Sequence, residues 1–185
     1  LNRRSFNGPI ATRAASGSLF TEIAAVMPGF IGGAADLVES MKKQIAEIIA
    51  SAPLETVTFF HEIDSTLYSA SSATFIGSLY QLLGLTNIAD AVDTAESFGY
   101  PQLSAEYVIE ADPEVIFLAD AAYGESAETV AARAGWAEIS AVKSGRVVPI
   151  DADISSRWGP RVVDFLQVVV DAVAEQREGF VEGQH

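Results

Sequence analysis

The run Val115–Ala119 constrains the fold of this chain more than any other stretch. It reads Val-Ile-Phe-Leu-Ala without a polar residue and leads directly into Asp120. A strand inside a parallel sheet is covered on both faces, and its sequence is such a continuous apolar run. We therefore expect a buried strand here, in a sheet with helices on both sides.

A loop and a short helix lead into this strand. Phe98-Gly99-Tyr100-Pro101 is typical of a loop, because glycine and proline punctuate it. Ser104 is a suitable N-cap for a helix that carries residues 107–109. Asp112-Pro113 ends that helix, since the residue before a proline is disfavoured in the α region.

The rest of the chain alternates strands with helices. Val57–Phe60 and Val147–Ile150 are rich in β-branched or aromatic residues, which predicts strands. Between and around them, apolar residues recur at helical spacing. The alternation predicts an α/β protein with a Rossmann-like, mostly parallel sheet that is flanked by helices and preceded by a long helix. Helices are expected over Phe20–Met27, Ala34–Ala50, Phe75–Leu83, Glu125–Ala134 and Val162–Val173.

Composition and motifs exclude several classes of function. The net charge of −14 argues against binding of nucleic acid, whose phosphates require a basic face. The chain has no cysteine, which excludes disulfides and cysteine metal sites. No apolar run approaches the ~18 residues of a membrane-spanning helix. Neither a nucleophile elbow nor a glycine-rich nucleotide loop is present, so we predict neither catalysis nor a cofactor.

The loops at the strand ends are the candidate binding region, because ligands of parallel sheets bind at the carboxyl ends of the strands. This rule selects His61–Ser72, Asp120–Gly124 and Asp151–Arg157. Aromatic side chains can hold a large planar ligand there while polar groups fix its orientation. Residues of these kinds in or beside the loops are Tyr68, Tyr123, Trp158, Glu62, Asp153 and Arg157.

Each of these residues also has a structural interpretation. An aromatic side chain can plug its loop onto the core, and Arg157 can form a salt bridge with an aspartate of its own loop. His61, Glu62 and Asp64 could instead hold a zinc or manganese ion. Consecutive side chains of a strand point to opposite faces, however, which disfavours a shared metal ion.

Several motifs occur in the order seen in a known family. They are Gly-Leu-Thr-Asn-Ile-Ala at 84–89, Tyr-Pro-Gln-Leu-Ser-Ala-Glu-Tyr-Val at 100–108, Ala-Asp-Pro-Glu-Val-Ile-Phe-Leu at 111–118, Gly-Trp at 135–136, Ala-Val-Lys-Ser-Gly-Arg-Val at 141–147 and Ser-Arg-Trp-Gly-Pro-Arg at 156–161. Together they resemble the C-terminal lobe of the ABC-importer substrate-binding proteins for ferric siderophores, haem and cobalamin. In that class one long helix joins two α/β lobes.

The resemblance implies how the chain is organised. Residues 53–178 would form the C-terminal ligand-binding lobe, and residues 19–52 a short helix plus the long linker helix. Residues 1–18 would be a leader or a poorly ordered segment, and 179–185 a tail. The N-terminal lobe that precedes the linker in the family has no counterpart in the sequence. Apolar surface on the linker and on the Phe20–Met27 helix would then be uncovered, which predicts a homo-oligomer.

The resemblance also implies a role and partners. A protein of this kind does no chemistry; outside the cytoplasm it captures an iron–siderophore complex, haem or cobalamin and presents it to an ABC permease. Family resemblance places the Phe98–Pro101 loop at the same edge as the strand-end loops. The predicted ligand-binding residues are therefore Tyr68, Phe98, Tyr100, Asp153, Arg157 and Trp158.

One residue is predicted to contact the permease. In the family an acidic residue on the outer rim of each lobe pairs with a permease arginine, and Glu106 is the matching position. Its structural interpretation is a first-turn glutamate that the helix dipole favours. The competing function for the whole chain is a non-catalytic, self-associating α/β interaction domain that binds no ligand.

Overall fold

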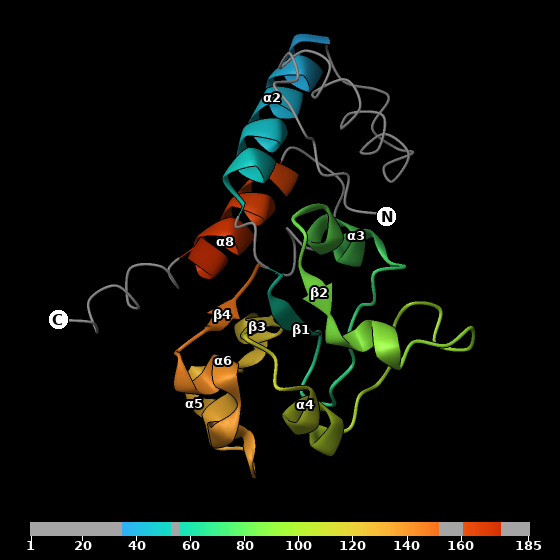
Figure 1. Ribbon diagram of the computed structural model, residues 1–185, viewed down its shortest axis with the longest axis vertical. Helices are drawn as coiled ribbons and strands as arrows, with labels where there is room; N and C mark the ends of the chain where they lie inside the picture. Colours follow the sequence, from blue (N-terminus) through green and yellow to red (C-terminus); the bar gives the residue numbers. More distant parts are fainter. Residues whose placement is uncertain (1–34, 53–55, 152–160, 175–185) are drawn as a thin grey trace, which may run out of the picture.

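A parallel sheet forms the centre of the molecule (Figure 1). The computed structural model describes residues 35–52, 56–151 and 161–174, and all elements named below lie in these ranges. The four strands lie in the order β2-β1-β3-β4 and every neighbouring pair is parallel, which confirms the predicted α/β class. The strands are β1 (Thr58–Glu62), β2 (Thr86–Asn87), β3 (Val115–Leu118) and β4 (Val147–Pro149).

The apolar run forms the central strand β3, as predicted. All four of its residues are buried. It pairs on one side with β1, where Phe59 lies opposite Val115, and on the other with β4, where Ile116 lies opposite Val147. A fully buried aliphatic or aromatic side chain stabilises the fold by roughly 1.5–3 kcal/mol relative to exposure. The core on both faces of the sheet is therefore anchored on this strand.

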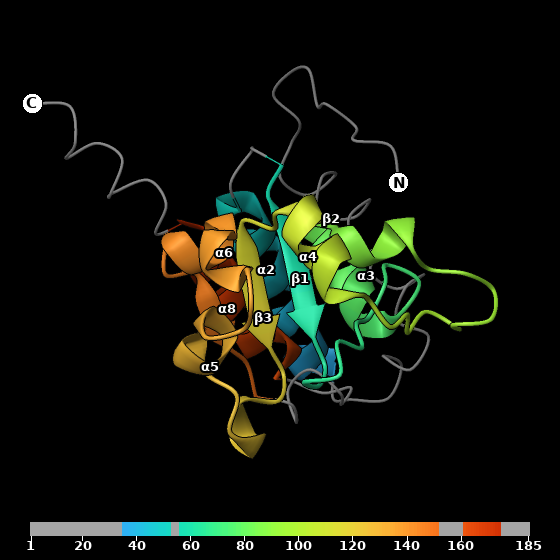
Figure 2. The same ribbon diagram turned by 90° about the horizontal axis from the view of Figure 1, so that it is seen from below.

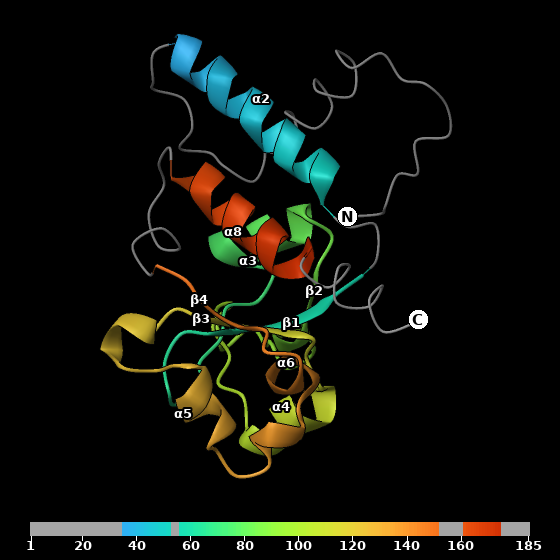
Figure 3. The ribbon, with the colours of Figure 1, turned by 90° about the vertical axis from the view of Figure 1, so that its left-hand side faces the viewer.

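One face of the sheet is covered by long helices (Figure 3). Here α3 and α8 lie on the strands, and α2 lies outside them, packed on α8. Phe59 and Phe117 point to this face and contact the ring of Tyr80, which also meets Phe165 edge-on. The helices are α2 (Ala35–Ser51), α3 (Phe75–Leu82) and α8 (Val162–Ala174).

Short helices cover the other face. Phe60, Ile116 and Leu118 point to this side and share a buried cluster with Trp136. The α-helices here are α4 (Ala105–Ala111), α5 (Ala127–Ala131) and α6 (Ser140–Lys143). The chain between these elements also forms the 3-10 turns η1 (Ile88–Ala91), η2 (Ala121–Tyr123) and η3 (Trp136–Glu138).

Local signals account for both ends of α4. The Ser104 hydroxyl caps α4 by accepting a hydrogen bond from the Tyr107 amide at 3.1 Å, as predicted. Asp112 leaves the right-handed helix through a left-handed conformation (φ +44°), and its carboxylate accepts from the amide and hydroxyl of Ser140. Strand β2 was not predicted, because its two residues are too few to show a period. The predicted Glu125–Ala134 helix is shorter, with α5 limited to Ala127–Ala131.

Over residues 40–51, α2, which is the predicted linker helix, exposes less apolar surface than expected. Met41, Ile45 and Ile48 are buried in this part of the helix. The exposed positions are 40, 43, 44, 47, 50 and 51, and Ala50 is the one apolar residue among them. The Phe20–Met27 helix, the 1–18 leader and the 179–185 tail lie outside the described residues. No helix in the described ranges is long and apolar enough to cross a membrane.

Candidate functional site

The arrows of β1 and β3 point to the same end of the sheet (Figure 2), and β4 is parallel to β3. We call the side of the sheet where the carboxyl ends of these three strands lie the strand-end edge. The parallel register places Glu62 opposite Leu118, and Leu118 opposite Pro149. The segments that follow the strands therefore leave the sheet side by side. Two of the three predicted loops, His61–Ser72 and Asp120–Gly124, are described in full, and the third is described only at Asp151.

Three exposed aromatic residues, Tyr68, Phe98 and Tyr100, form what we call the aromatic patch. They come from two segments, 67–71 and 97–103, that run alongside each other in opposite directions. The sequence placed these segments together only through the family resemblance, whereas the backbone hydrogen bonds join them directly. The bonds run from Leu103 N to Leu67 O (2.9 Å), from Ser69 N to Pro101 O (2.9 Å) and from Ser71 N to Gly99 O (2.8 Å).

The side chains of the patch face solvent. Tyr68 is 40% exposed, Tyr100 is 50% exposed and Phe98 is 84% exposed. Tyr123, on η2 at the end of β3, is 87% exposed. These exposures argue against the interpretation in which Phe98 and Tyr123 plug their loops onto the core. The patch offers apolar aromatic faces on a backbone that is fixed from both sides, which suits a large, flat ligand.

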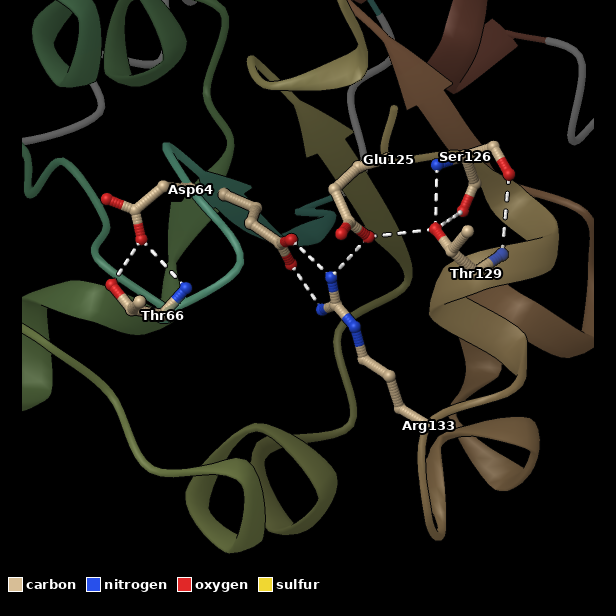
Figure 4. A network of polar contacts seen from close by, with 7 residues as sticks. Asp64, Thr66, Glu125, Ser126, Thr129 and Arg133 are labelled. Carbon is tan, nitrogen blue, oxygen red and sulfur yellow. Dashed lines mark hydrogen bonds and ion pairs between the residues drawn. The ribbon is translucent and has the colours of Figure 1, made fainter. Parts of the chain in front are cut away.

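At the end of β1, Glu62, Arg133 and Glu125 form what we call the Arg133 network (Figure 4). Both terminal nitrogens of Arg133 donate to the carboxylate of Glu62, at 2.7 and 2.6 Å, and one also donates to Glu125 at 2.8 Å. The guanidinium lies 4.6 Å from the ring centre of Trp136. This two-pronged geometry is the strongest form of carboxylate pairing. It fixes α5 to the end of β1.

The electrostatics of the network follow from burial. Glu62 is fully buried, and desolvation raises its pKa although Arg133 acts in the opposite direction. The pKa of Arg133 is raised, first through its hydrogen bonds to Glu62. Glu125 is partly exposed, and its pKa is lowered by the Thr129 hydroxyl and by Arg133. The pair Glu62–Arg133 is thus a buried ion pair, and Glu125 is its solvent-side partner.

Asp120 is the one buried carboxylate at this edge whose oxygens have no hydrogen-bond partner among the described residues. Its side chain follows β3 and is 4% exposed. Burial raises its pKa, and the nearby charges of Glu125 and Asp64 act in the same direction. Its own backbone amide and the charge of Arg133 oppose them. An unpaired buried carboxylate is destabilising when ionised.

His61, Glu62 and Asp64 do not converge on a metal ion. The His61 Nδ1 lies 3.0 Å from the hydroxyl oxygen of Tyr80 on the α3–α8 side, whereas Glu62 binds Arg133 on the other face. Asp64 instead accepts hydrogen bonds from the amide and hydroxyl of Thr66. Across the described part of the chain, no three His, Cys, Asp or Glu side chains are placed to share a metal ion.

The remaining predicted site residues divide into two groups. Asp153, Arg157 and Trp158 lie outside the described residues, and their roles remain predictions. Asp151, at the start of the same loop, pairs with Arg161 at 2.8 Å. Glu106 is exposed in the first turn of α4.

Arg133 was missed by sequence reasoning. The one signal for it is indirect: Glu62 ends a strand with both faces covered, and a carboxylate buried there needs a cation. The sequence could not say which cation, because Arg133 is 71 positions further along the chain.

Comparisons with known proteins agree with these observations. The family model described as "Periplasmic binding protein" matches residues 33–154. An uncharacterized ABC transporter substrate-binding lipoprotein of Bacillus subtilis, YvrC, is 31% identical over 157 residues, covering 80% of this chain and 48% of that protein. A cobalamin-binding protein of Halobacterium salinarum is 29% identical over 145 residues, covering 75% of this chain and 38% of that protein. The chain thus spans about half or less of the length of these relatives.

A solved structure shows the same fold. It is described as a possible iron-binding (periplasmic solute-binding) protein from Staphylococcus epidermidis, with a TM-score of 0.65 and 26% identity. The match covers 89% of this chain and 64% of that one. The parallel sheet with helices on both faces is therefore an architecture that a solved periplasmic solute-binding protein also has over the matched part.

Proposed function

Because the chain belongs to the periplasmic binding protein family, we propose that it is the C-terminal lobe of the substrate-binding component of an ABC importer. In this role it acts outside the cytoplasm, captures an iron–siderophore complex or cobalamin at the strand-end edge, and presents it to the permease. It binds the ligand without transforming it. Haem is a third ligand of the same kind.

The observation that supports this role best is the aromatic patch. Tyr68, Phe98 and Tyr100 expose large apolar rings at the edge where ligands of parallel sheets bind. Rings of this kind contact the flat faces of corrins, porphyrins and aromatic chelates. The cobalamin-binding protein of Halobacterium salinarum and the ABC transporter lipoprotein of Bacillus subtilis, both related in sequence, have the expected ligand and transport setting.

A titration tests the proposal. Tyrosine and tryptophan fluorescence of the chain is recorded against aquocobalamin, haemin and a ferric tris-catecholate. We expect saturable quenching by at least one of these probes. The variants Phe98→Ala and Tyr100→Leu should each weaken that binding about tenfold, because a stacked aromatic ring contributes about 1.5 kcal/mol.

Tyr123→Leu is the matched control, since Tyr123 is as exposed as Phe98 but lies on η2, after β3, and belongs to neither segment of the patch. We expect its affinity to equal that of the unchanged chain. Absence of saturable binding to all three probes, or equal loss in Phe98→Ala and Tyr123→Leu, would contradict ligand capture by the patch.

We further propose that Glu106 docks on the permease. It is exposed on the first turn of α4, where its carboxylate is free to meet an arginine. Glu106→Arg should abolish ligand uptake through the matching permease by like-charge repulsion, while leaving ligand affinity unchanged. Glu110→Arg, in the exposed last turn of the same helix, is the control and should leave uptake normal. Normal uptake by a folded Glu106→Arg protein would leave Glu106 with only its helix-dipole role, worth a few tenths of a kcal/mol.

A further inference from the structure

Phe98 is held in a position that is unfavourable for two reasons. Its ring is 84% exposed, and its backbone has φ +50°, in the left-handed region that residues other than glycine rarely adopt. Such a conformation persists only where the surrounding structure imposes it. The neighbouring Gly99 also has a positive φ of +85°. We call residues 94–100 the aromatic loop. Contacts made by this loop must therefore hold Phe98 in its unfavourable conformation.

The carboxylate of Asp93 supplies these contacts. It follows η1 directly and accepts hydrogen bonds from the hydroxyl of Ser71, at 2.6 Å, and from the hydroxyl of Ser97. These two bonds lower the pKa of Asp93, and the backbone amides of Gly99 and Thr94 contribute in the same direction. One ionised side chain thus binds the beginning and the end of the aromatic loop and joins both to the segment that carries Tyr68.

The loop also lies against a rigid support. A Cβ at Gly99 would lie 2.8 Å from the Thr74 Cγ2, and a Cβ at Gly77 would lie 1.9 Å from the carbonyl oxygen of Ser71. Thr74 caps α3 by accepting from the Gly77 amide. The aromatic loop, the Ser71 turn and the first turn of α3 are therefore in contact without room for adjustment.

We propose that Asp93 is a positioning residue that holds the aromatic loop in its ligand-binding shape, so that Phe98 and Tyr100 are presented beside Tyr68 before ligand arrives. The proposal rests on the ligand-binding role proposed above. A loop that already has its bound shape avoids the ordering cost of binding. Apparent affinity falls in proportion to the fraction of time that the loop spends in that shape.

Asp93→Ala tests the proposal, and Asp90→Ala is its matched control. Asp90 lies on η1, three positions earlier, and its carboxylate also accepts from a serine, through the amide and hydroxyl of Ser72, both at 2.7 Å. Those bonds do not reach the aromatic loop. We expect faster hydrogen exchange of the Gly99 and Tyr100 amides in Asp93→Ala and unchanged exchange in Asp90→Ala. Unchanged exchange at these amides in Asp93→Ala would overturn the proposal.

Ligand binding provides the second readout. If the loop of Asp93→Ala keeps the bound shape for about a tenth of the time, its affinity for aquocobalamin falls about tenfold. Combining the change with Phe98→Ala distinguishes positioning from general destabilisation. We expect the double variant to lose less affinity than the sum of the two single losses, because Asp93 acts through Phe98 as well as through Tyr100. Full additivity of the two losses would show that Asp93 does not act through Phe98.

The two proposals fail in different ways. If Phe98→Ala binds aquocobalamin, haemin and ferric tris-catecholate as well as the unchanged chain, the patch is not the ligand site, while the exchange data still decide whether Asp93 holds the loop. If Phe98→Ala weakens binding and Asp93→Ala does not, the patch stands and Asp93 has no positioning role.

Discussion

His61 and Glu62 are neighbours in β1, and the two faces of the sheet surround them with opposite chemistry. His61 points to the α3–α8 face, where burial lowers its pKa to about 4 and its Nδ1 lies 3.0 Å from the Tyr80 hydroxyl oxygen. Glu62 points to the other face, where both terminal nitrogens of Arg133 bind it. Equal burial thus gives a neutral group on one face and an ion pair on the other. What decides the outcome is whether a guanidinium lies within reach.

Removal of Arg133 should have the largest effect. Arg133→Met leaves the Glu62 carboxylate buried without its cation, and breaking a buried pair in this way typically costs roughly 3–5 kcal/mol in the free energy of unfolding. Urea denaturation at pH 7 measures it. Lys143→Met is the control, because Lys143 pairs with Glu138 on the surface and such pairs contribute about 0–1 kcal/mol. Equal losses of unfolding free energy in the two variants would show that the ion pair with Arg133 does not stabilise the buried Glu62 carboxylate.

The opposite face should respond to acid through His61. Above pH 6.5 this histidine is neutral in both the folded and the unfolded chain. As the pH falls from 6.5 to about 4, the unfolded chain binds a proton that the folded chain does not, so stability is lost. The full difference is about 3 kcal/mol.

The variant His61→Gln isolates this effect, because it cannot ionise. The contributions of Glu62 and Asp120 are common to both proteins and cancel in the difference. Urea denaturation at a series of pH values should show that the variant loses less stability than the unchanged chain between pH 6.5 and 4. Parallel pH curves would mean that His61 has the same pKa in the folded and the unfolded protein.

Asp120 should have a smaller effect on stability than His61, with the opposite dependence on pH. Burial raises its pKa above the ordinary value of 3.8, so its contribution to stability is full at lower pH and is lost as the pH rises through the raised pKa. Asp120→Asn removes the charge while keeping the shape. We expect it to stabilise the chain by about 1 kcal/mol at pH 7. The gain should disappear near pH 3.8, and a loss of stability at pH 7 would indicate a hydrogen bond to the Asp120 carboxylate in solution.

The smallest effect is expected at Glu125. Its carboxylate is the solvent-side partner of Arg133 and is 22% exposed. Glu125→Gln should cost about 0.5 kcal/mol in urea denaturation, as for other partly exposed pairs. A loss as large as that of Arg133→Met would show that Arg133 depends on both carboxylates rather than chiefly on Glu62.

The sequence predicted the parts of this molecule that depend on local patterns. β3 was found because its whole run is apolar, and the cap of α4 was found because Ser104 precedes a short apolar helix. The Arg133 network could not be found in this way, since Glu62 and Arg133 are far apart in the sequence and come together only in the folded protein. The role proposed for Asp93 also left no signal, because an aspartate in a polar loop resembles any other. The position of the Phe98–Pro101 loop at the same edge as the loop of Tyr68 was implied by family resemblance alone, and the pairing of the two segments was not predicted.

The two outermost strands of the sheet, β2 and β4, affect how copies of this chain could associate. β2 contributes two residues at one edge, and β4 contributes three at the other, ending at Pro149. A proline has no backbone N–H to donate, and such short edge strands offer little backbone for a strand of another molecule to extend. Edge-to-edge growth of the sheet, a common route to aggregation, is therefore disfavoured. Among the described elements, helices and loops therefore offer the more favourable surfaces for an oligomer.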